Sequence, residues 1–95
     1  MADVRFHPEA QSEYEAAIAW YRARSSNAAS RFEVDRVSEM IADNPELFAR
    51  YDDEHRFALL RRFPYSLVYS VQPADIYIIA VAHSSRAPGY WKDRA

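Results

Sequence analysis

Two groups of polar and aromatic side chains in the second half of the chain have the composition of an anion-binding surface. Arg61 and Arg62 stand at a Phe-Pro-Tyr corner, whereas His83, Arg86 and Tyr90 follow an apolar run. Guanidinium groups bind phosphates or carboxylates through paired hydrogen bonds, and neighbouring aromatic rings can stack on bases. With His83 or Tyr90 as proton carrier, such a set could also cleave RNA by positioning and charge stabilisation. These residues therefore predict contact with a macromolecule.

Each of these side chains also has a structural interpretation, which stays open at the level of sequence. Arg61 and Arg62 could pair with the acids of the preceding loop, which are Asp52, Asp53 and Glu54. His83 could simply cap the strand that it ends, and Trp91 could plug the edge of the core.

Several other kinds of site are not expected. His7, His55 and His83 are far apart and show no metal-ligand spacing. Ser84 and Ser85 adjoin His83, but neighbours at a strand end seldom face each other, so we expect no nucleophilic triad. The single glycine cannot form a phosphate loop, and the absence of cysteine excludes thiolate sites and fits a reducing cytoplasm. We expect no metal and no cofactor.

The length and the charge distribution define the class of protein. Ninety-five residues make one domain with a single modest core. Residues 1–54 carry six Arg and twelve acidic residues, a net charge of −6, whereas residues 55–95 carry six basic and two acidic residues, a net charge of +4. This asymmetry predicts a basic face suited to an acidic partner or nucleic acid. No apolar run approaches the ~20 residues of a membrane span, and no secretion signal is visible, so we expect a cytoplasmic protein.

The elements that would position these residues begin with a strand over Asp3–His7 and a helix that starts at Pro8 and fades near Arg24. Glu13 is expected to face solvent on this helix. A second helix is predicted over Ala28–Asp43, because Asn44-Pro45 ends it. The two helices should form an antiparallel pair.

Three further strands are predicted over Arg56–Leu60, Ser66–Val71 and Ile76–His83. Short turns make them an antiparallel meander, and the last strand is apolar on both faces and therefore central. Pairing its free edge with the first strand gives an α+β, two-layer β-α-α-β-β-β fold. Its four-stranded antiparallel sheet has the order 1-4-3-2 and is covered on one face by the helical hairpin. Tight turns would place the ends of the second and fourth strands at opposite ends of the sheet, so the two basic groups would form two patches.

Three sequence blocks resemble the RelE/ParE superfamily of type II toxin–antitoxin toxins. They are FHPEAQSEYEAAIAWY, NPELFARYDDEHRFALLRRFPYSLVYSV and IIAVAHSSRAPGYWKDR, and the resemblance covers residues 1–95 as a single domain. It implies a small cytoplasmic toxin of the plasmid-stabilisation type, which inhibits growth until a cognate antitoxin wraps around it. The antitoxin contacts expected from this resemblance lie on the first helix, at Tyr14, Trp20 and Tyr21.

The superfamily divides by mechanism. RelE-like toxins cleave mRNA in the ribosomal A site with basic residues on two strands, a late arginine and a C-terminal tyrosine. At the positions where RelE-like toxins carry these strand residues, this sequence has Phe57, Leu59 and Ser66, none of which is basic. The residues that could still carry RelE-like catalysis are Arg61, His83, Arg86 and Tyr90.

The loss of these charges favours a ParE-like toxin, which inhibits DNA gyrase by binding and needs no catalytic residues. The residues expected to contact the target or nucleic acid are Arg56, Arg61, Arg62, Arg86, Trp91 and Lys92. The alternatives are a ribosome-dependent mRNA endonuclease, and an inactive remnant or pure interaction module.

Overall fold

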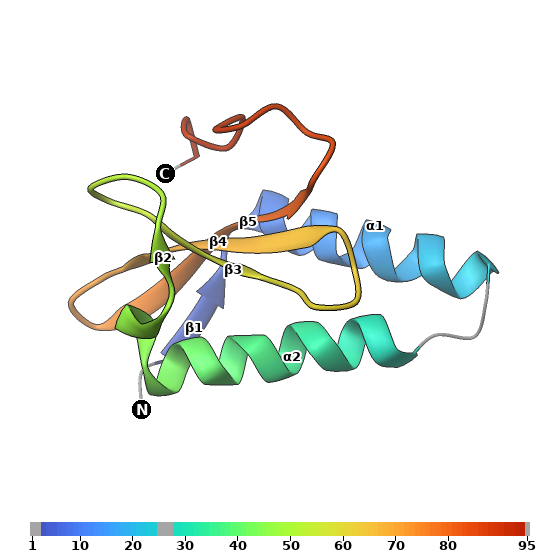
Figure 1. The fold of residues 1–95 in the computed structure, drawn as a ribbon, viewed down its shortest axis with the longest axis horizontal. Helices are drawn as coiled ribbons and strands as arrows, with labels where there is room; N and C mark the ends of the chain where they lie inside the picture. Colours follow the sequence, from blue (N-terminus) through green and yellow to red (C-terminus); the bar gives the residue numbers. More distant parts are fainter. Residues whose placement is uncertain (1–2, 25–27, 95) are drawn as a thin grey trace.

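In the computed structural model, which describes residues 3–24 and 28–94, two α-helices cover one face of a five-stranded sheet (Figure 1). The elements in chain order are β1 (Asp3–Phe6), α1 (Pro8–Arg24), α2 (Ala28–Asp43), the 3-10 helix η1 (Pro45–Leu47), β2 (Ala49–Arg50), β3 (Arg56–Leu59), β4 (Tyr65–Val71) and β5 (Asp75–His83). The α+β class and the helical hairpin are thus as predicted.

Both helices have the predicted bounds. Pro8 begins α1, and the Nδ1 atom of His7 accepts a hydrogen bond from the Glu9 N–H at 3.0 Å, so His7 caps the helix. Its last turn carries Arg22 and Arg24, whose charges complement the helix dipole. The second helix, α2, ends at Asp43, two residues before the proline that opens η1. Neither of these described helices is long and apolar enough to cross a membrane.

The predicted four-stranded antiparallel sheet in the order 1-4-3-2 has the wrong number of strands and one strand in the wrong direction, although the four predicted strands keep their relative order as β1-β5-β4-β3. The sheet has five strands in the order β1-β5-β4-β3-β2, because Ala49 and Arg50 pair with the start of β3. The first strand, β1, runs parallel to β5, not antiparallel to it. The additional strand, β2, explains this difference, since it adds one reversal of the chain between α2 and β3.

A β-bulge in the centre of the sheet breaks the alternation predicted for the last strand. Val68 pairs with Ala80 and Tyr69 pairs with Ile78, so Ile79 is an extra residue on β5. Such a bulge exchanges the faces of the residues that follow it. Ala80 therefore lies on the face opposite to that of Ile78, although a regular strand would place both residues on one face.

Apolar residues pack on both faces of the sheet. The larger core lies between the helices and the sheet; its fully buried large residues are Ile41, Leu67, Tyr69, Ile76 and Ile78. On the other face, Val68, Ile79 and Ala80 pack against Trp91, whose side chain is 3% exposed. Residues 84–94 cover part of this face as the chain returns across the strands (Figure 1).

Candidate functional site

The two basic groups lie at the same end of the sheet. Tyr65, the first residue of β4, pairs with His83, the last residue of β5, and the Ser84 N–H donates to the Pro64 carbonyl at 2.7 Å. The Arg61–Arg62 corner between β3 and β4 therefore lies beside the segment that follows β5 (Figure 1). The expectation of two separate patches was wrong, because the first and third strands of an antiparallel meander end on the same side.

The last turns of α1 join this end through aromatic contacts. The Tyr21 ring lies edge-on to Phe63, with ring centroids 4.8 Å apart, and also contacts Tyr65. The adjoining arginines Arg22 and Arg24 are exposed. We call the resulting surface the basic end; it comprises Arg22, Arg24, Arg61, Arg62, His83 and Arg86. The two α1 arginines were not among the predicted contacts, because they belong to the acidic half of the chain.

The alternative pairing of Arg61 and Arg62 with the preceding acidic loop does not occur. Within residues 3–24 and 28–94, neither guanidinium forms an ion pair. Asp52 of that loop instead lies 2.9 Å from His55 Nδ1. The corner is held by its backbone, since the Arg62 N–H donates to the buried Glu33 carboxylate at 3.3 Å. Both guanidinium groups therefore remain exposed.

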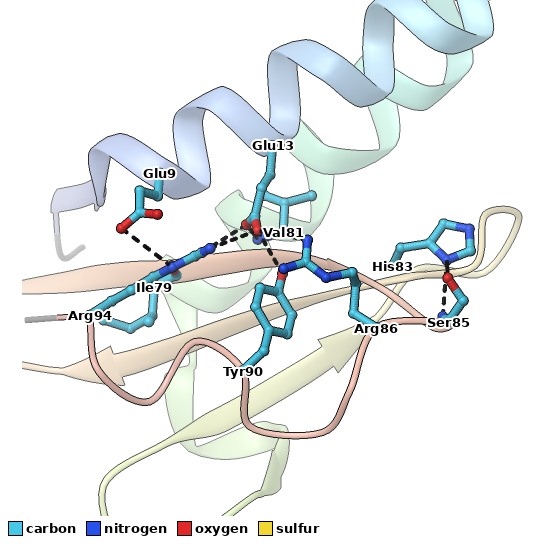
Figure 2. A network of polar contacts seen from close by, with 9 residues as sticks. All are labelled: Glu9, Glu13, Ile79, Val81, His83, Ser85, Arg86, Tyr90 and Arg94. Carbon is cyan, nitrogen blue, oxygen red and sulfur yellow. Dashed lines mark hydrogen bonds and ion pairs between the residues drawn. The ribbon is translucent and has the colours of Figure 1, made fainter.

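Glu13 is the centre of a polar network that joins α1, β5 and the C-terminal segment (Figure 2). Its carboxylate accepts hydrogen bonds from the Tyr90 hydroxyl at 2.7 Å and the Val81 N–H at 3.0 Å. Two further hydrogen bonds, both 2.9 Å long, come from the Arg94 guanidinium. The side chains of Glu13 and Arg94 are 16% and 10% exposed, so the expectation that Glu13 faces solvent was wrong.

The network shifts the pKa values of its members. Burial by itself would raise the pKa of Glu13, but hydrogen bonds from Arg94, Tyr90 and Val81 outweigh burial and lower it. The hydrogen bond to Glu13 raises the pKa of Arg94. Burial, together with the adjacent carboxylate, raises the pKa of Tyr90 to about 12. At neutral pH the cluster is therefore an ion pair with a neutral phenol.

This network also completes an edge of the sheet. The first strand, β1, pairs with β5 only as far as Ile78, and the backbone groups of β5 beyond that point need other partners. Glu13 accepts from the Val81 N–H, and Arg94 donates to the Ile79 carbonyl at 3.1 Å. Side chains 68 and 15 residues away in sequence thus replace a missing strand.

Arg86 and Tyr90 are stacked and partly neutralised. The Arg86 guanidinium lies 3.8 Å from the centroid of the Tyr90 ring, and its Nη1 atom is 3.9 Å from a Glu13 oxygen (Figure 2). The Tyr90 hydroxyl is committed as a donor to Glu13, and its high pKa keeps it protonated. It is therefore a poor proton carrier near neutral pH.

His83 ends β5 with a local cap, as its structural interpretation proposed. Its Nδ1 atom lies 3.0 Å from the Ser85 backbone nitrogen and 2.8 Å from the Ser85 hydroxyl oxygen. The expectation that these neighbours do not face each other was wrong. Because the same Nδ1 accepts the backbone N–H, the contact is a capping turn, and the ring packs edge-on against Tyr65 at 5.0 Å.

Three predicted target contacts lie away from the basic end. Arg56 donates to the Phe48 carbonyl at 2.7 Å and so fixes the segment before β2. Lys92 lies 5.3 Å from the centroid of the Tyr51 ring. Trp91 is buried against that same ring, and its burial is not compatible with a direct target contact.

An apolar groove of about 450 Å³ lies within the basic end, between α1 and the adjoining end of the sheet. Its lining includes Trp20, Tyr21, Pro64, Tyr65, His83 and Arg86. Trp20 is 50% exposed, and the Arg24 guanidinium stacks 3.8 Å from the centroid of its ring. Two of the three predicted antitoxin contacts thus border this groove, whereas the half-buried Tyr14 stacks on Phe6 and donates to Asp35.

A metal centre has no ligand set in the part of the chain that the structure describes, where no three His, Cys, Asp or Glu side chains are grouped suitably. The site therefore consists of the cationic basic end and the apolar groove, next to the buried Glu13–Arg94 ion pair.

Comparisons with known proteins agree with this fold. The family model described as "ParE toxin of type II toxin-antitoxin system, parDE" matches residues 4–88. A solved structure titled "Chromosomal ParDE TA system from P. aeruginosa" superposes with a TM-score of 0.66 at 17% identity, over 87% of this chain and 96% of that one. The isolated E. coli RelE toxin superposes with a TM-score of 0.67 at 18% identity, over 97% and 94%. A search of curated protein sequences found no significant match.

Proposed function

This chain belongs to the ParE toxin family of type II toxin–antitoxin systems, within the RelE/ParE superfamily, and from that premise we propose that it inhibits DNA gyrase by binding. In this proposal it halts growth from the cytoplasm, as part of a plasmid-stabilisation module, and a cognate antitoxin neutralises it. The family sets the class of protein, and the arrangement of the side chains favours binding over RNA cleavage.

The observation that carries the proposal is the position of Glu13. Cleavage of a phosphodiester needs cations that are free to stabilise the developing charge and a group that can move a proton. Glu13 withdraws Arg94 into an internal ion pair and holds Tyr90 as a neutral donor. The tyrosine that RelE-like cleavage would use is thus engaged within the molecule, and the late arginine, Arg86, is stacked on that tyrosine and lies 3.9 Å from a Glu13 oxygen.

The third strand supports the same conclusion. Phe57 and Leu59 occupy positions that are basic in RelE-like toxins, and Leu59 is 69% exposed, so its surroundings would tolerate a charge that the sequence does not supply. The remaining candidates for target contact are Arg61, Arg62 and Arg86, which gather at the basic end. They suit electrostatic docking to a protein or nucleoprotein surface.

The groove beside α1 supports an antitoxin contact. Trp20 and Tyr21 offer a large apolar area, and exposed aromatic rings next to a groove are typical of partner-binding sites. We propose that an antitoxin segment covers this groove and shields the neighbouring arginines, which would explain neutralisation by simple occlusion.

The test is a supercoiling assay with purified DNA gyrase and relaxed plasmid, together with induction of the toxin alone in cells. We expect inhibition of supercoiling and intact mRNA in arrested cells. Arg61→Ala/Arg62→Ala should raise the half-inhibitory concentration at least about tenfold, the equivalent of 1.4 kcal/mol. Arg5→Ala/Arg50→Ala, which removes the same charge from exposed positions at the other end, is the matched control. Unaffected supercoiling at high toxin excess would refute gyrase inhibition, and codon-positioned cuts on translating ribosomes would establish the nuclease.

A further inference from the structure

We propose that the basic end is a binding site for single-stranded nucleic acid, with an unstacked base in the groove beside Trp20 and the flanking phosphates on the surrounding arginines. This inference goes beyond the proposed function, because it concerns the isolated chain and nucleic acid and requires no gyrase.

The first argument is the separation of charge along the molecule. Cationic side chains from three distant segments converge on the basic end, while the acidic loop over residues 52–54 precedes β3 at the opposite end. Two carboxylates approach the basic end and both are already engaged: Glu13 with Arg94, and the buried Glu33 with Arg36 at 3.7 Å. A chain with a net charge of −2 thus presents a locally positive surface.

The second argument is the shape and lining of the groove. Its volume of about 450 Å³ exceeds that of a single base, and aromatic rings line it from both sides. On the helix side, Trp20 is half-exposed, and its ring meets Tyr21 edge-on with centroids 4.9 Å apart. On the sheet side, Tyr65 and His83 form a second edge-on pair, with centroids 5.0 Å apart. Aromatic platforms of this kind accept any base, because every base has a π-face.

The third argument is the placement of guanidinium groups at the rim. Arg24 is stacked on Trp20, and Arg86 is stacked on Tyr90; both ring-to-guanidinium distances are 3.8 Å. Stacking orients the planar group and leaves edge donors available for a phosphate. Arg61 and Arg62 extend the positive surface beyond Pro64, one of the residues that line the groove.

These features favour nucleic acid over an acidic peptide. A peptide carboxylate would be satisfied by the arginines alone and would not need two facing pairs of aromatic rings. A strand of nucleotides alternates planar bases with phosphates, and this alternation matches rings inside the groove and cations along its border.

The experiment is a titration of the full chain with fluorescently labelled twelve-residue oligothymidylate, followed by anisotropy at 50 and 200 mM salt. The comparison probes are an abasic oligomer with the same backbone and a polyglutamate of equal charge. We expect the thymidylate to bind at least about fivefold more tightly than the abasic oligomer, the lower limit for one stacked base. The affinity should fall steeply with salt.

Variants test the base-binding and phosphate-binding parts of the site separately. Trp20→Ala should remove the preference for thymidylate over the abasic oligomer. Arg61→Ala/Arg62→Ala should lower the slope of log affinity against log salt by about 1.4, since each phosphate contact on a single strand contributes roughly 0.7. Arg5→Ala/Arg50→Ala should leave both quantities unchanged, and circular dichroism confirms that each variant is folded.

The comparisons on the unmutated chain decide the proposal even if a variant fails to fold. Equal affinity for thymidylate and the abasic oligomer would overturn the base site, and equal affinity for polyglutamate would show a peptide-type surface. The absence of saturable binding to any probe would overturn the inference altogether. A toxin that binds thymidylate without affecting supercoiling would retain this inference and refute gyrase inhibition.

Discussion

Replacing Glu13 by glutamine tests whether the buried carboxylate holds the C-terminal segment on the sheet. Glutamine has nearly the same volume, but its amide offers one acceptor oxygen where the carboxylate offers two. The carboxylate accepts four hydrogen bonds, from the Val81 N–H, the Tyr90 hydroxyl and two nitrogens of Arg94. The variant would place an amide N–H against donors and leave the 10%-exposed Arg94 guanidinium with the 66%-exposed Glu9, 3.9 Å away, as its counter-charge.

The expected destabilisation follows from these contacts. Removing one member of a buried ion pair costs about 3–5 kcal/mol, and Glu13 is 16% exposed, which favours the lower part of that range. We therefore expect a loss of about 3 kcal/mol in the free energy of unfolding. A domain of this size has roughly 5–15 kcal/mol in total, so the variant should fold, with Tm lowered by about 15 °C.

The assay is urea unfolding followed by circular dichroism at neutral pH. Glu15→Gln is the matched control, because Glu15 is an exposed acid on the same helix and bonds only its neighbour Gln11 among the contacts described; it should change stability by less than about 0.5 kcal/mol. The double variant Glu13→Gln/Arg94→Gln should be less destabilised than the sum of its single variants. A loss below about 0.5 kcal/mol for Glu13→Gln, or strict additivity in the cycle, would refute the reasoning.

Acid should affect the stability of the unmutated protein and of the Glu13→Gln variant differently. The pKa of Glu13 is lower in the folded state than its ordinary value of 4.5, so the unfolded chain binds more protons as the pH falls below about that value. The stabilisation by Glu13 is therefore present above pH 4.5 and is lost as the pH falls through the folded pKa. The Glu13→Gln variant should lack this part of the acid dependence.

Three further predictions concern other parts of the fold. Burial raises the pKa of both Tyr69 and Tyr90 to about 12, so stability should decline as the pH rises from 10 to 12; the phenolate absorbance of these two residues, taken as the difference from their Tyr→Phe variants, should appear only on unfolding, and its appearance below pH 11 in the folded state would contradict this. Gly89 has a φ of +74°, and a Cβ there would lie 3.0 Å from Lys92 Cε, so Gly89→Ala should cost at least about 1 kcal/mol in urea unfolding; an unchanged midpoint would be inconsistent with that geometry. Trp91→Ala should cost about 3–5 kcal/mol and expose the second apolar face to a hydrophobic dye, whereas a loss under 1 kcal/mol would show that the ring is not a core element.

The helices and the three longer C-terminal strands were predictable because their signals are local. Pro8 and the Asn44-Pro45 pair mark helix boundaries by backbone geometry alone. The fourth strand, β4, is a run of β-branched and aromatic residues in a period-two pattern. By contrast, Ala49 and Arg50 form a strand too short to show any period, and missing it also reversed the direction predicted for β1. The bulge at Ile79 likewise leaves no mark on an apolar run.

The candidate site was predictable in residue type but not in arrangement. The arginines at the corner and after β5 were identified from their surroundings. They were assigned to two separate patches because the ends of β3 and β5 were expected at opposite ends of the sheet. Glu13 was assigned to solvent because its partners Tyr90 and Arg94 lie 77 and 81 residues away in the sequence. Glu13 lies between Glu9 and Glu15 on the same helix, and nothing in the local sequence distinguishes the buried carboxylate from its exposed neighbours. The α1 arginines were missed for the same reason, since tertiary contacts of Tyr21 bring them to the basic end.

The strand order has a consequence for synthesis on the ribosome. An interior position of the sheet, between β1 and β4, is filled by β5, the last of the five described strands to be translated. Until residues 75–83 emerge, β1 has no strand to join and α1 lacks the strand against which most of its sheet-facing side packs. Such long-range closures slow folding and discourage stable partial products. The nascent chain therefore gains its working surface in a single late step.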